Sequence, residues 1–321
     1  MKHHASVFGL RISSLVCTLA FAVGSQVFAA NRPLRSVGLS VGDLGNPFFV
    51  QIAKGAEART RALGGPNVKF TAVSSGYDLN AQMNQLEDFT AAQVDLIILG
   101  AADTKGIAPA VRKAKAAGIV VVAVDVAAAG GVDATVMSDN VQAGRLVAEF
   151  TVAQLKGKGR VVIINGPSVS AVTDRVAGAE GVFSHYHGIE VLSRDQNAEG
   201  NRMGGLNVMT SLLTAYPDID AVFAINDPSA LGAALALQQA RRREVFVVGV
   251  DGAPDAEKAL RDPKSPFWAT AAQDPFAMAA KAVEIGVGIL GGRRPADALI
   301  LIPVTLVTRA NVGAFRGWTD K

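Results

Sequence analysis

The stretch SVGLSVGDLGNPFF, residues 36–49, predicts a strand that runs into a helix. Asn46 is a favoured helix cap, and proline is tolerated in the first turn because its missing N–H would have no partner there. The helix is therefore predicted to begin at Pro47. Phe48 and Phe49 then lie at the carboxyl end of a strand, where open α/β sheets bind their ligands. Two rings at that place can stack on the C–H faces of a sugar.

The same alternation of strand and helix continues along nearly the whole chain. The predicted strands are 36–41, 68–74, 95–100, 119–125, 160–165, 189–193, 221–226 and 245–251. The predicted helices include 47–63, 79–93, 106–117, 141–155 and 228–240. Several strands are apolar without alternation, as expected for parallel strands covered on both faces. The pattern indicates an α/β fold with parallel sheets and right-handed crossovers.

The strand series appears twice, and each copy ends in an aspartate: VAVD at 122–125 and VGVD at 248–251. This repeat predicts two similar doubly wound lobes that face one another. Residues 137–140 form a first crossing between them, and a strand at 268–273 and another at 299–307 supply further crossings. A hinge of several strands restricts the lobes to bending and twisting. The expected units are an N-terminal lobe of 30–138 plus about 274–304 and a C-terminal lobe of 139–273 plus about 305–321.

Residues 1–29 have the pattern of a secretory signal peptide. Lys2 and Arg11 make a basic start, residues 15–23 form a short apolar run, and residues 27–29 offer a cleavage site. The run is too short to span a membrane. We therefore expect a protein exported to the periplasm.

The single cysteine, Cys17, lies in this leading segment, so the mature chain has neither a disulfide nor a thiol nucleophile. A lipoprotein anchor at Cys17 is the alternative. It is disfavoured because residues 14–16 lack the small residue usual directly before such a cysteine.

Composition excludes a nucleic-acid partner. Without the leading segment, 29 of the 31 basic residues remain against 28 acidic ones, a charge near +1. The cluster Arg241-Arg242-Arg243 follows a predicted helix and reads as a solvated helix end rather than a phosphate-binding stripe. The mature chain of about 290 residues is long for one core, which also favours two domains.

Catalysis and metal binding find little support. There is no Gly-x-Ser-x-Gly elbow. His185 and His187 are two apart near the end of a helical stretch, where they point away from each other; on a strand the spacing would permit a metal site. Gly204-Gly205 lies within a helical pattern and is more simply explained by packing or a hinge than by phosphate binding. We expect no enzyme activity, no cofactor and no metal.

Polar side chains gather instead at the carboxyl ends of the predicted strands. Carboxylates, amides and an arginine fork are the groups that bind vicinal hydroxyls. These side chains belong to Asn46, Asp125, Asn226, Asp251 and Gln273, with Arg175 opening the helix after strand 160–165. Each one alone is equally explained as a cap or turn residue. Their shared position at strand ends favours a ligand site.

The chain closely resembles the periplasmic sugar-binding proteins of the ribose-binding type, the type I periplasmic binding protein or lactose-repressor-like fold. The resemblance rests on NPFF at 46–49, SDN at 138–140, GLNVM at 205–209, LLTA at 212–215, AVFA at 221–224, ND at 226–227, VDG at 250–252 and AT at 269–270 before Gln273. It implies a sugar cleft lined by Asn46, Phe48, Phe49, Asp125, Ser138, Arg175, Asn226, Asp251 and Gln273.

Two positions depart from the family pattern. Val126 stands where ribose binders carry an arginine, and Gly200 stands where they place an aromatic ring. A sugar oxygen left unpaired in a closed site costs about 1–3 kcal/mol. The departures therefore favour a differently shaped pentose, a hexose or a sugar alcohol over ribose. Arg175 also leaves room for a sugar acid.

The resemblance implies capture of a monosaccharide or polyol for an ABC importer, whose permease in the inner membrane is the expected partner of a monomeric protein. A sensory role, presenting the sugar to a chemoreceptor or a sensor kinase, is the alternative. Transcriptional regulation would require a helix-turn-helix before the first lobe, where a signal peptide stands instead. An exported enzyme comes last, because no nucleophile, base and orienting group come together.

Overall fold

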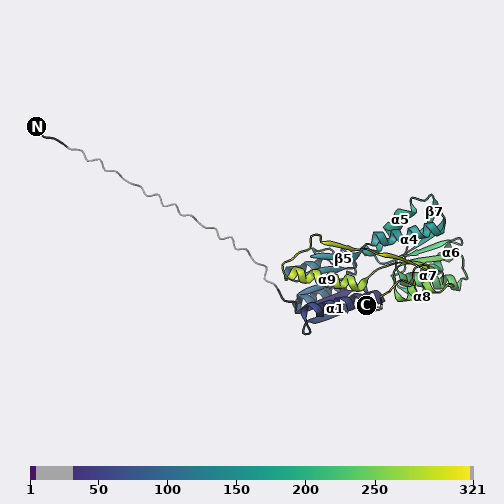
Figure 1. The fold of residues 1–321 in the computed structure, drawn as a ribbon, viewed down its shortest axis with the longest axis horizontal. Helices are drawn as coiled ribbons and strands as arrows, with labels where there is room; N and C mark the ends of the chain where they lie inside the picture. Colours follow the sequence, from purple (N-terminus) through teal and green to yellow (C-terminus); the bar gives the residue numbers. More distant parts are fainter. Residues whose placement is uncertain (5–31, 319–321) are drawn as a thin grey trace.

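The computed structural model describes residues 1–4 and 32–318 and forms two α/β lobes side by side (Figure 1). The first lobe holds a six-stranded sheet in the order β11-β5-β4-β3-β1-β2. Its strands are β1 (Ser36–Val41), β2 (Lys69–Ser74), β3 (Leu96–Leu99), β4 (Val120–Val124), β5 (Ala134–Ser138) and β11 (Leu299–Ile302). Its helices are α1 (Pro47–Gly64), α2 (Leu79–Ala91), α3 (Ala108–Ala116) and α9 (Pro275–Leu290).

The second lobe holds a six-stranded sheet in the order β12-β10-β9-β8-β6-β7. Its strands are β6 (Lys158–Asn165), β7 (Gly188–Asn197), β8 (Ala221–Ala224), β9 (Phe246–Asp251), β10 (Phe267–Ala272) and β12 (Thr305–Thr308). Its helices are α4 (Asn140–Gln154), α5 (Ser170–Phe183), α6 (Arg202–Ala215), α7 (Asp227–Gln239) and α8 (Pro254–Arg261). None of the helices in the described ranges is long and apolar enough to cross a membrane.

The two sheets have the same connectivity, which confirms the prediction of two similar parallel-sheet lobes. Strands β1 to β5 of the first sheet match β6 to β10 of the second, position by position. The edge strands differ, because β11 runs parallel to β5 whereas β12 runs antiparallel to β10. Asp125, directly after β4, and Asp251, at the end of β9, therefore occupy equivalent places in the two lobes.

Within residues 32–318 the chain passes between the lobes three times. It crosses after β5 into α4, after β10 into α9, and between β11 and β12. Helix α4 packs on α5 and β10, whereas α9 packs on α1 and β4. Three crossings form one hinge, which restricts the lobes to bending and twisting about it. The carboxyl ends of both sheets are turned toward the space between the lobes.

Two predictions about strands were wrong. Residues 134–138 were not among the predicted strands, yet Ala134–Ser138 forms β5, a fully buried strand between β4 and β11 that leads into the crossing expected at 137–140. The predicted strand 299–307 is two strands, because its halves pair with different sheets. Pro303, which has no N–H to give to a sheet, marks the break. A single-sequence pattern records apolarity but not which sheet a segment joins.

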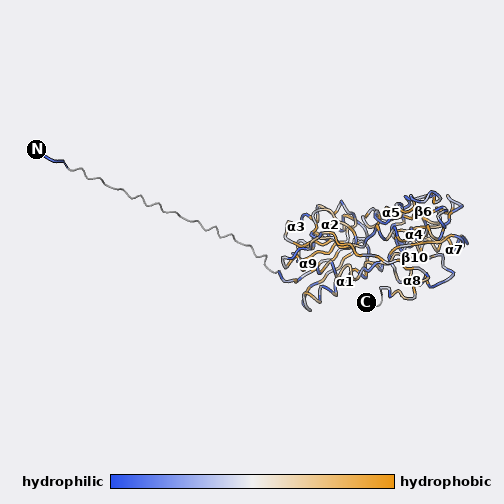
Figure 2. Tube along the Cα trace, turned by 45° about the horizontal axis from the view of Figure 1, so that its top comes forward, coloured by the Kyte–Doolittle hydropathy of each residue, from blue (hydrophilic) through white to orange (hydrophobic). Residues whose placement is uncertain are grey.

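The core of each lobe follows its sheet. Every residue of β3, β4, β8 and β9 is buried. Figure 2 shows the hydrophobic positions gathered along the central strands, with hydrophilic ones on the outer helices and loops. Helices cover both faces of each sheet, so these strands need no polar face.

Helices α4 and α5 approach so closely that glycines are required at their crossing. An ideal Cβ on Gly144 would lie 1.9 Å from the carbonyl oxygen of Arg175, and one on Gly178 would lie 2.2 Å from that of Val141. Real Cβ atoms do not approach a carbonyl oxygen to this distance. This contact fixes the distance between α4 and α5, and with it the position of the α5 backbone that carries Arg175.

We expect Gly178→Ala to lower the free energy of unfolding by about 1–3 kcal/mol, because the added methyl group must push α4 away. Gly181 lies one turn further along α5 and has open space at its Cβ position. Gly181→Ala should be neutral or stabilising by up to about 1 kcal/mol, since alanine favours a helix over glycine. Urea unfolding of both variants measures the difference; equal stabilities would contradict the close contact.

Candidate functional site

A cavity of about 50 Å³ lies between the carboxyl ends of the two sheets and is lined by both lobes. The predicted site residues that line it are Asn46, Phe48, Phe49, Asp125, Arg175, Asn226 and Asp251. We call this space the inner cavity. Seven of the nine predicted residues, drawn from positions 46 to 251, are thus brought to one place.

The two aspartates of the repeat face this cavity in strained backbone conformations. Asp125 has φ +68° and Asp251 has φ +136°, although neither is glycine. Such conformations cost of order 1–3 kcal/mol and persist only where the surrounding structure enforces them. Both side chains are buried, with 6% and 3% of their surface exposed. The fold therefore holds two carboxylates in matched positions at the cost of stability.

Arg175 is the cation between them. Its Nε donates to Asn140 Oδ1 at 2.8 Å, and its Nη1 donates to the carbonyl oxygen of Ile225 at 2.9 Å. Nη1 also lies 3.5 Å from Asp251 Oδ1, and both side chains are buried. The prediction that Arg175 opens its helix was wrong, because α5 begins at Ser170 and Arg175 lies in its second turn. That extra turn is what brings the guanidinium to the cavity.

Ser138 and Gln273 do not line the inner cavity; they lie beside it at two of the crossings. Gln273 Nε2 donates to Asp251 Oδ1 at 2.8 Å, so it braces that carboxylate. Gln273 Oε1 and Ser138 Oγ are buried and have no hydrogen-bond partner among the described residues. Both therefore retain polar atoms close to the hinge.

The buried carboxylates have raised pKa values. Burial raises the pKa of Asp125 to about 7, opposed by the nearby Arg175 and assisted by Asp251. Burial likewise raises the pKa of Asp251 to about 6, opposed by Arg175 and by the hydrogen bond from Gln273. Asp125 Oδ1 has no donor within the described chain. One positive charge thus serves two carboxylates, and Asp125 can accept hydrogen bonds from a ligand.

Aromatic rings form the wall on the side of the first lobe. The rings of Phe48 and Phe49 meet edge to face with centroids 5.5 Å apart. Trp318 packs on Phe48 at 5.9 Å, and Tyr77 packs on Phe49 at 6.2 Å. Tyr77 lines the inner cavity but was missed from the sequence, because a tyrosine in the turn after β2 carries no motif.

The two asparagines also serve as helix caps, as the alternative explanation from sequence allowed. Asn46 Oδ1 accepts from Phe48 N at 3.0 Å. Asn226 Oδ1 accepts from Ser229 N at 3.0 Å, and its Nδ2 donates to the carbonyl oxygen of Gly200 at 2.8 Å. The caps fix both amides at the edge of the inner cavity, so capping and lining are compatible.

Asp227 is a further buried acid that sequence reasoning did not select. Its two oxygens accept from Ala253 N and Thr270 Oγ1, each at 2.8 Å. Burial, followed by the charge of Asp251, raises its pKa well above the ordinary range. It does not line the inner cavity, and its bonds hold the turn after Asp251 in place.

The histidine pair lies elsewhere. His185 and His187 are exposed in the turn between α5 and β7. Among the described residues, no three His, Cys, Asp or Glu side chains are grouped to hold a metal. The predicted signal peptide and Cys17 fall on residues 5–31, outside the described part of the chain.

A family model described as "Periplasmic binding protein domain" matches residues 37–294. The "Ribose import binding protein RbsB" of Salmonella typhimurium is 35% identical over 291 residues, which cover 88% of this chain and 96% of that protein. The chain belongs to the periplasmic binding proteins of the ribose-binding type. The resemblance inferred from the sequence motifs is thereby confirmed.

Solved structures of periplasmic binding proteins share the two-lobed fold. A solute-binding protein of an ABC transporter from Bacillus halodurans, with bound myo-inositol, superimposes with a TM-score of 0.79 at 28% identity, over 88% of this chain and 97% of that one. A protein from Actinobacillus succinogenes with bound D-allose gives 0.79 at 27%, over 88% and 100%. These relatives are binding proteins of transporters rather than enzymes.

Proposed function

We propose that this protein captures one monosaccharide or sugar alcohol between its lobes in the periplasm and delivers it to an ABC importer. The observation that carries the proposal is the inner cavity, where Asp125 from one lobe and Asp251 and Arg175 from the other converge. Only a closed form brings both lobes to the same ligand, so binding favours closure. The permease then recognises the closed surface of a monomer.

Each lining group has a role suited to a neutral polyhydroxyl ligand. Asp125 and Asp251 accept from hydroxyl groups, and Arg175 donates to ring or hydroxyl oxygens. Phe48 and Phe49 cover the C–H face of the ring. Asn46 and Asn226 complete the hydrogen bonds from the rim, with Ser138 and Gln273 supporting them from the hinge.

The two departures from the family pattern bear on which sugar fits. Val126 is a buried, apolar part of the cavity wall, and Gly200 adds no side chain to it. The cavity thus offers one guanidinium where a ribose binder has two. Relatives are named for ribose, xylitol, D-apiose and D-ribose/D-allose, which supports a pentose, a hexose or a polyol as the ligand class. A sensory role, in which a chemoreceptor or sensor kinase reads the same closed form, stays a prediction.

A thermal-shift screen against pentoses, hexoses, and cyclic and linear polyols tests the proposal. A ligand at a hundred times its Kd should stabilise the folded state by about 2.7 kcal/mol and raise the Tm by several degrees. Calorimetry should then give one site per chain. No shift with any member of these three classes would overturn the proposal.

Affinity for a neutral sugar should rise with pH between about 5.5 and 7.5. Ligand-free Asp125, with its pKa raised to about 7, is protonated over much of this range. Sugar hydroxyls bind the ionised carboxylate more strongly, so binding lowers the pKa and releases a proton; the gain in affinity is about tenfold or more. Calorimetry in buffers of different ionisation enthalpy measures the release, and Asp125→Asn should abolish it. A flat profile would contradict this role of Asp125.

The stability of the ligand-free protein should change in the opposite direction. The raised pKa values of Asp125 and Asp251 mean that the folded state binds more protons than the unfolded chain above about pH 4. The resulting stability is fully present at low pH and is lost as pH rises through about 6 to 7. Urea unfolding across this range measures how the free energy of unfolding depends on pH. Asp125→Asn should make that dependence weaker.

A further inference from the structure

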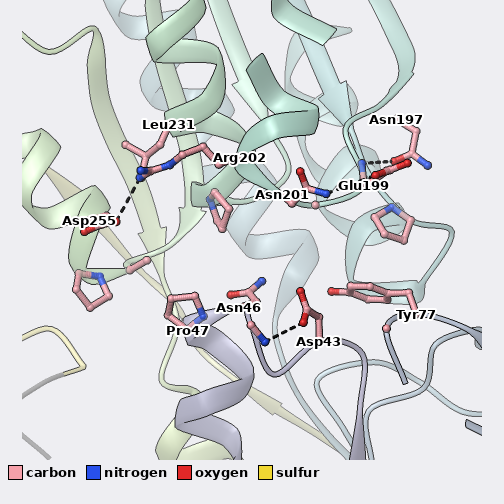
Figure 3. Close-up of a pocket in the computed structure, with 17 residues that line it drawn as sticks. Asp43, Asn46, Pro47, Tyr77, Asn197, Glu199, Asn201, Arg202, Leu231 and Asp255 are labelled. Atoms are coloured by element: carbon pink, nitrogen blue, oxygen red, sulfur yellow. Dashed lines mark hydrogen bonds and ion pairs between the residues drawn. The ribbon is translucent and has the colours of Figure 1, made fainter. Parts of the chain in front are cut away.

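A second and much larger cavity, of about 840 Å³, lies at the outer edge of the cleft (Figure 3). One wall is formed by the loop between β1 and α1, with Asp43 and Asn46, and by the turn after β2, with Tyr77. The loop before α6 and the starts of α7 and α8 form the other, with Glu199, Asn201 and Asp255 among its residues. We call this space the outer groove.

The outer groove adjoins the inner cavity. Asn46, Tyr77, Pro167 and Gly200 line both spaces. Gly200 lies at this boundary without a side chain, and its φ of +65° disfavours any other residue. A Cβ at that position would lie 3.4 Å from Asn226 Nδ2, so a longer side chain would crowd the boundary between the two spaces.

The groove is not simply the gap of an open hinge, because the lobes already touch across the cleft. The N–H of Ala127 in the first lobe donates to Ser170 Oγ in the second at 2.7 Å. The N–H of Ser170 in turn donates to Thr104 Oγ1 at 3.3 Å. The lobes are therefore in contact on one side of the cleft while the outer groove remains on another.

The walls of the groove suit a neutral, hydroxyl-rich group. The groove is lined by three carboxylates, those of Asp43, Glu199 and Asp255, and by one guanidinium, that of Arg202. Arg202 is already paired with Asp255 at 3.3 Å. The excess negative charge disfavours phosphate and carboxylate groups. In Figure 3 the hydroxyl of Tyr77 points toward Asp43, and prolines present flat apolar surfaces between the polar groups.

We propose that the outer groove is a second subsite that takes the next sugar ring of a glycoside, whose terminal ring occupies the inner cavity. This inference rests on the proposed function, since it requires a sugar in the inner cavity. The buried, unpartnered Asp125 Oδ1 anchors the terminal ring. The glycosidic bond then leaves the inner cavity beside Gly200, where no side chain stands in its way.

Calorimetry with matched pairs tests the subsite: xylose and xylobiose, glucose with maltose and cellobiose, and galactose with melibiose. At least one disaccharide should bind tenfold or more tightly than its monosaccharide, whereas glucose 6-phosphate should gain nothing over glucose. Monosaccharide binding with no tighter disaccharide would overturn the subsite and leave the proposed function standing. A protein that binds no sugar of either size and no polyol would overturn both.

Two leucines on α7 give a matched pair of variants. Leu231 lines the outer groove, whereas Leu235, one turn further along, is exposed and does not line it. Leu231→Trp should obstruct part of the groove and weaken disaccharide binding at least tenfold without changing monosaccharide affinity. Leu235→Trp should change neither. Disaccharide affinity unchanged by Leu231→Trp, or an equal loss for both sugars, would contradict a separate outer subsite.

Discussion

Arg175→Leu is expected to lower sugar affinity by about a hundredfold or more, equivalent to about 2.7 kcal/mol. Arg175 is the cation that lines the inner cavity, and the substitution removes its bonds to Asn140 and Ile225 together with its ion pair to Asp251. Removing one partner of a buried pair leaves an uncompensated charge, so folding stability should also fall by about 3–5 kcal/mol. Calorimetry with the best ligand of the screen measures the first effect, and urea unfolding measures the second.

Arg194 provides the control. It lies in the same lobe and pairs with Glu180 at 2.8 Å, but its side chain is half exposed. Arg194→Leu should leave affinity unchanged and alter stability by less than about 1 kcal/mol. Circular dichroism confirms that both variants are folded before titration. Sugar binding by Arg175→Leu within threefold of the parent would exclude the guanidinium as a ligand group.

Asp251→Ala is expected to weaken sugar binding by about 2–3 kcal/mol, a factor of about 30 to 150. The substitution removes an acceptor for the ligand, the ion-pair partner of Arg175 and the acceptor of Gln273 Nε2. It also removes the negative charge that helps to raise the pKa of Asp125. The pH dependence of binding should therefore move to lower pH, which calorimetry across pH 5–8 detects.

Asp251→Asn separates charge from shape, because the amide keeps one acceptor oxygen but no charge. The sugar affinity of Asp251→Asn should lie between that of the parent protein and that of Asp251→Ala. Asp218, exposed in a loop of the same lobe and paired with Arg160, is the control position, and Asp218→Ala should bind sugar normally. The double variant Arg175→Leu with Asp251→Ala should lose less than the sum of the single losses, because the two side chains act as a pair.

The predicted site came from strand ends, and the structure explains why that reasoning worked. In a parallel α/β sheet the carboxyl ends of all strands meet at one edge, so Asp125 and Asp251 had to lie at the edges of their sheets. The NPFF motif likewise fixed the start of α1. The family resemblance supplied Ser138 and supported Arg175, whose place in the second turn of α5 local patterns did not show.

Other parts of the site depend on long-range packing and leave no local signal. Trp318 reaches Phe48 from the last described residue, and Tyr77 reaches Phe49 from the turn after β2. Gly200 was noticed as a missing ring, but only the tertiary structure shows that it lines both the inner cavity and the outer groove. Strand β5 was missed for a similar reason, since the five-residue segment ATVMS acquires a sheet only from its neighbours.

The sequence by itself determined the alternation of strands and helices, the repeat of the two lobes, and the residues at their strand ends. These features follow from local rules: the covering of parallel strands on both faces, the capping of helices, and the preferences of proline and asparagine. Tertiary structure alone decided that one arginine serves two buried carboxylates, and that the lobes touch at Ser170 while a groove remains beside Gly200. Burial, charge pairing and the shape of a cleft arise between segments far apart in the chain, so no local pattern records them.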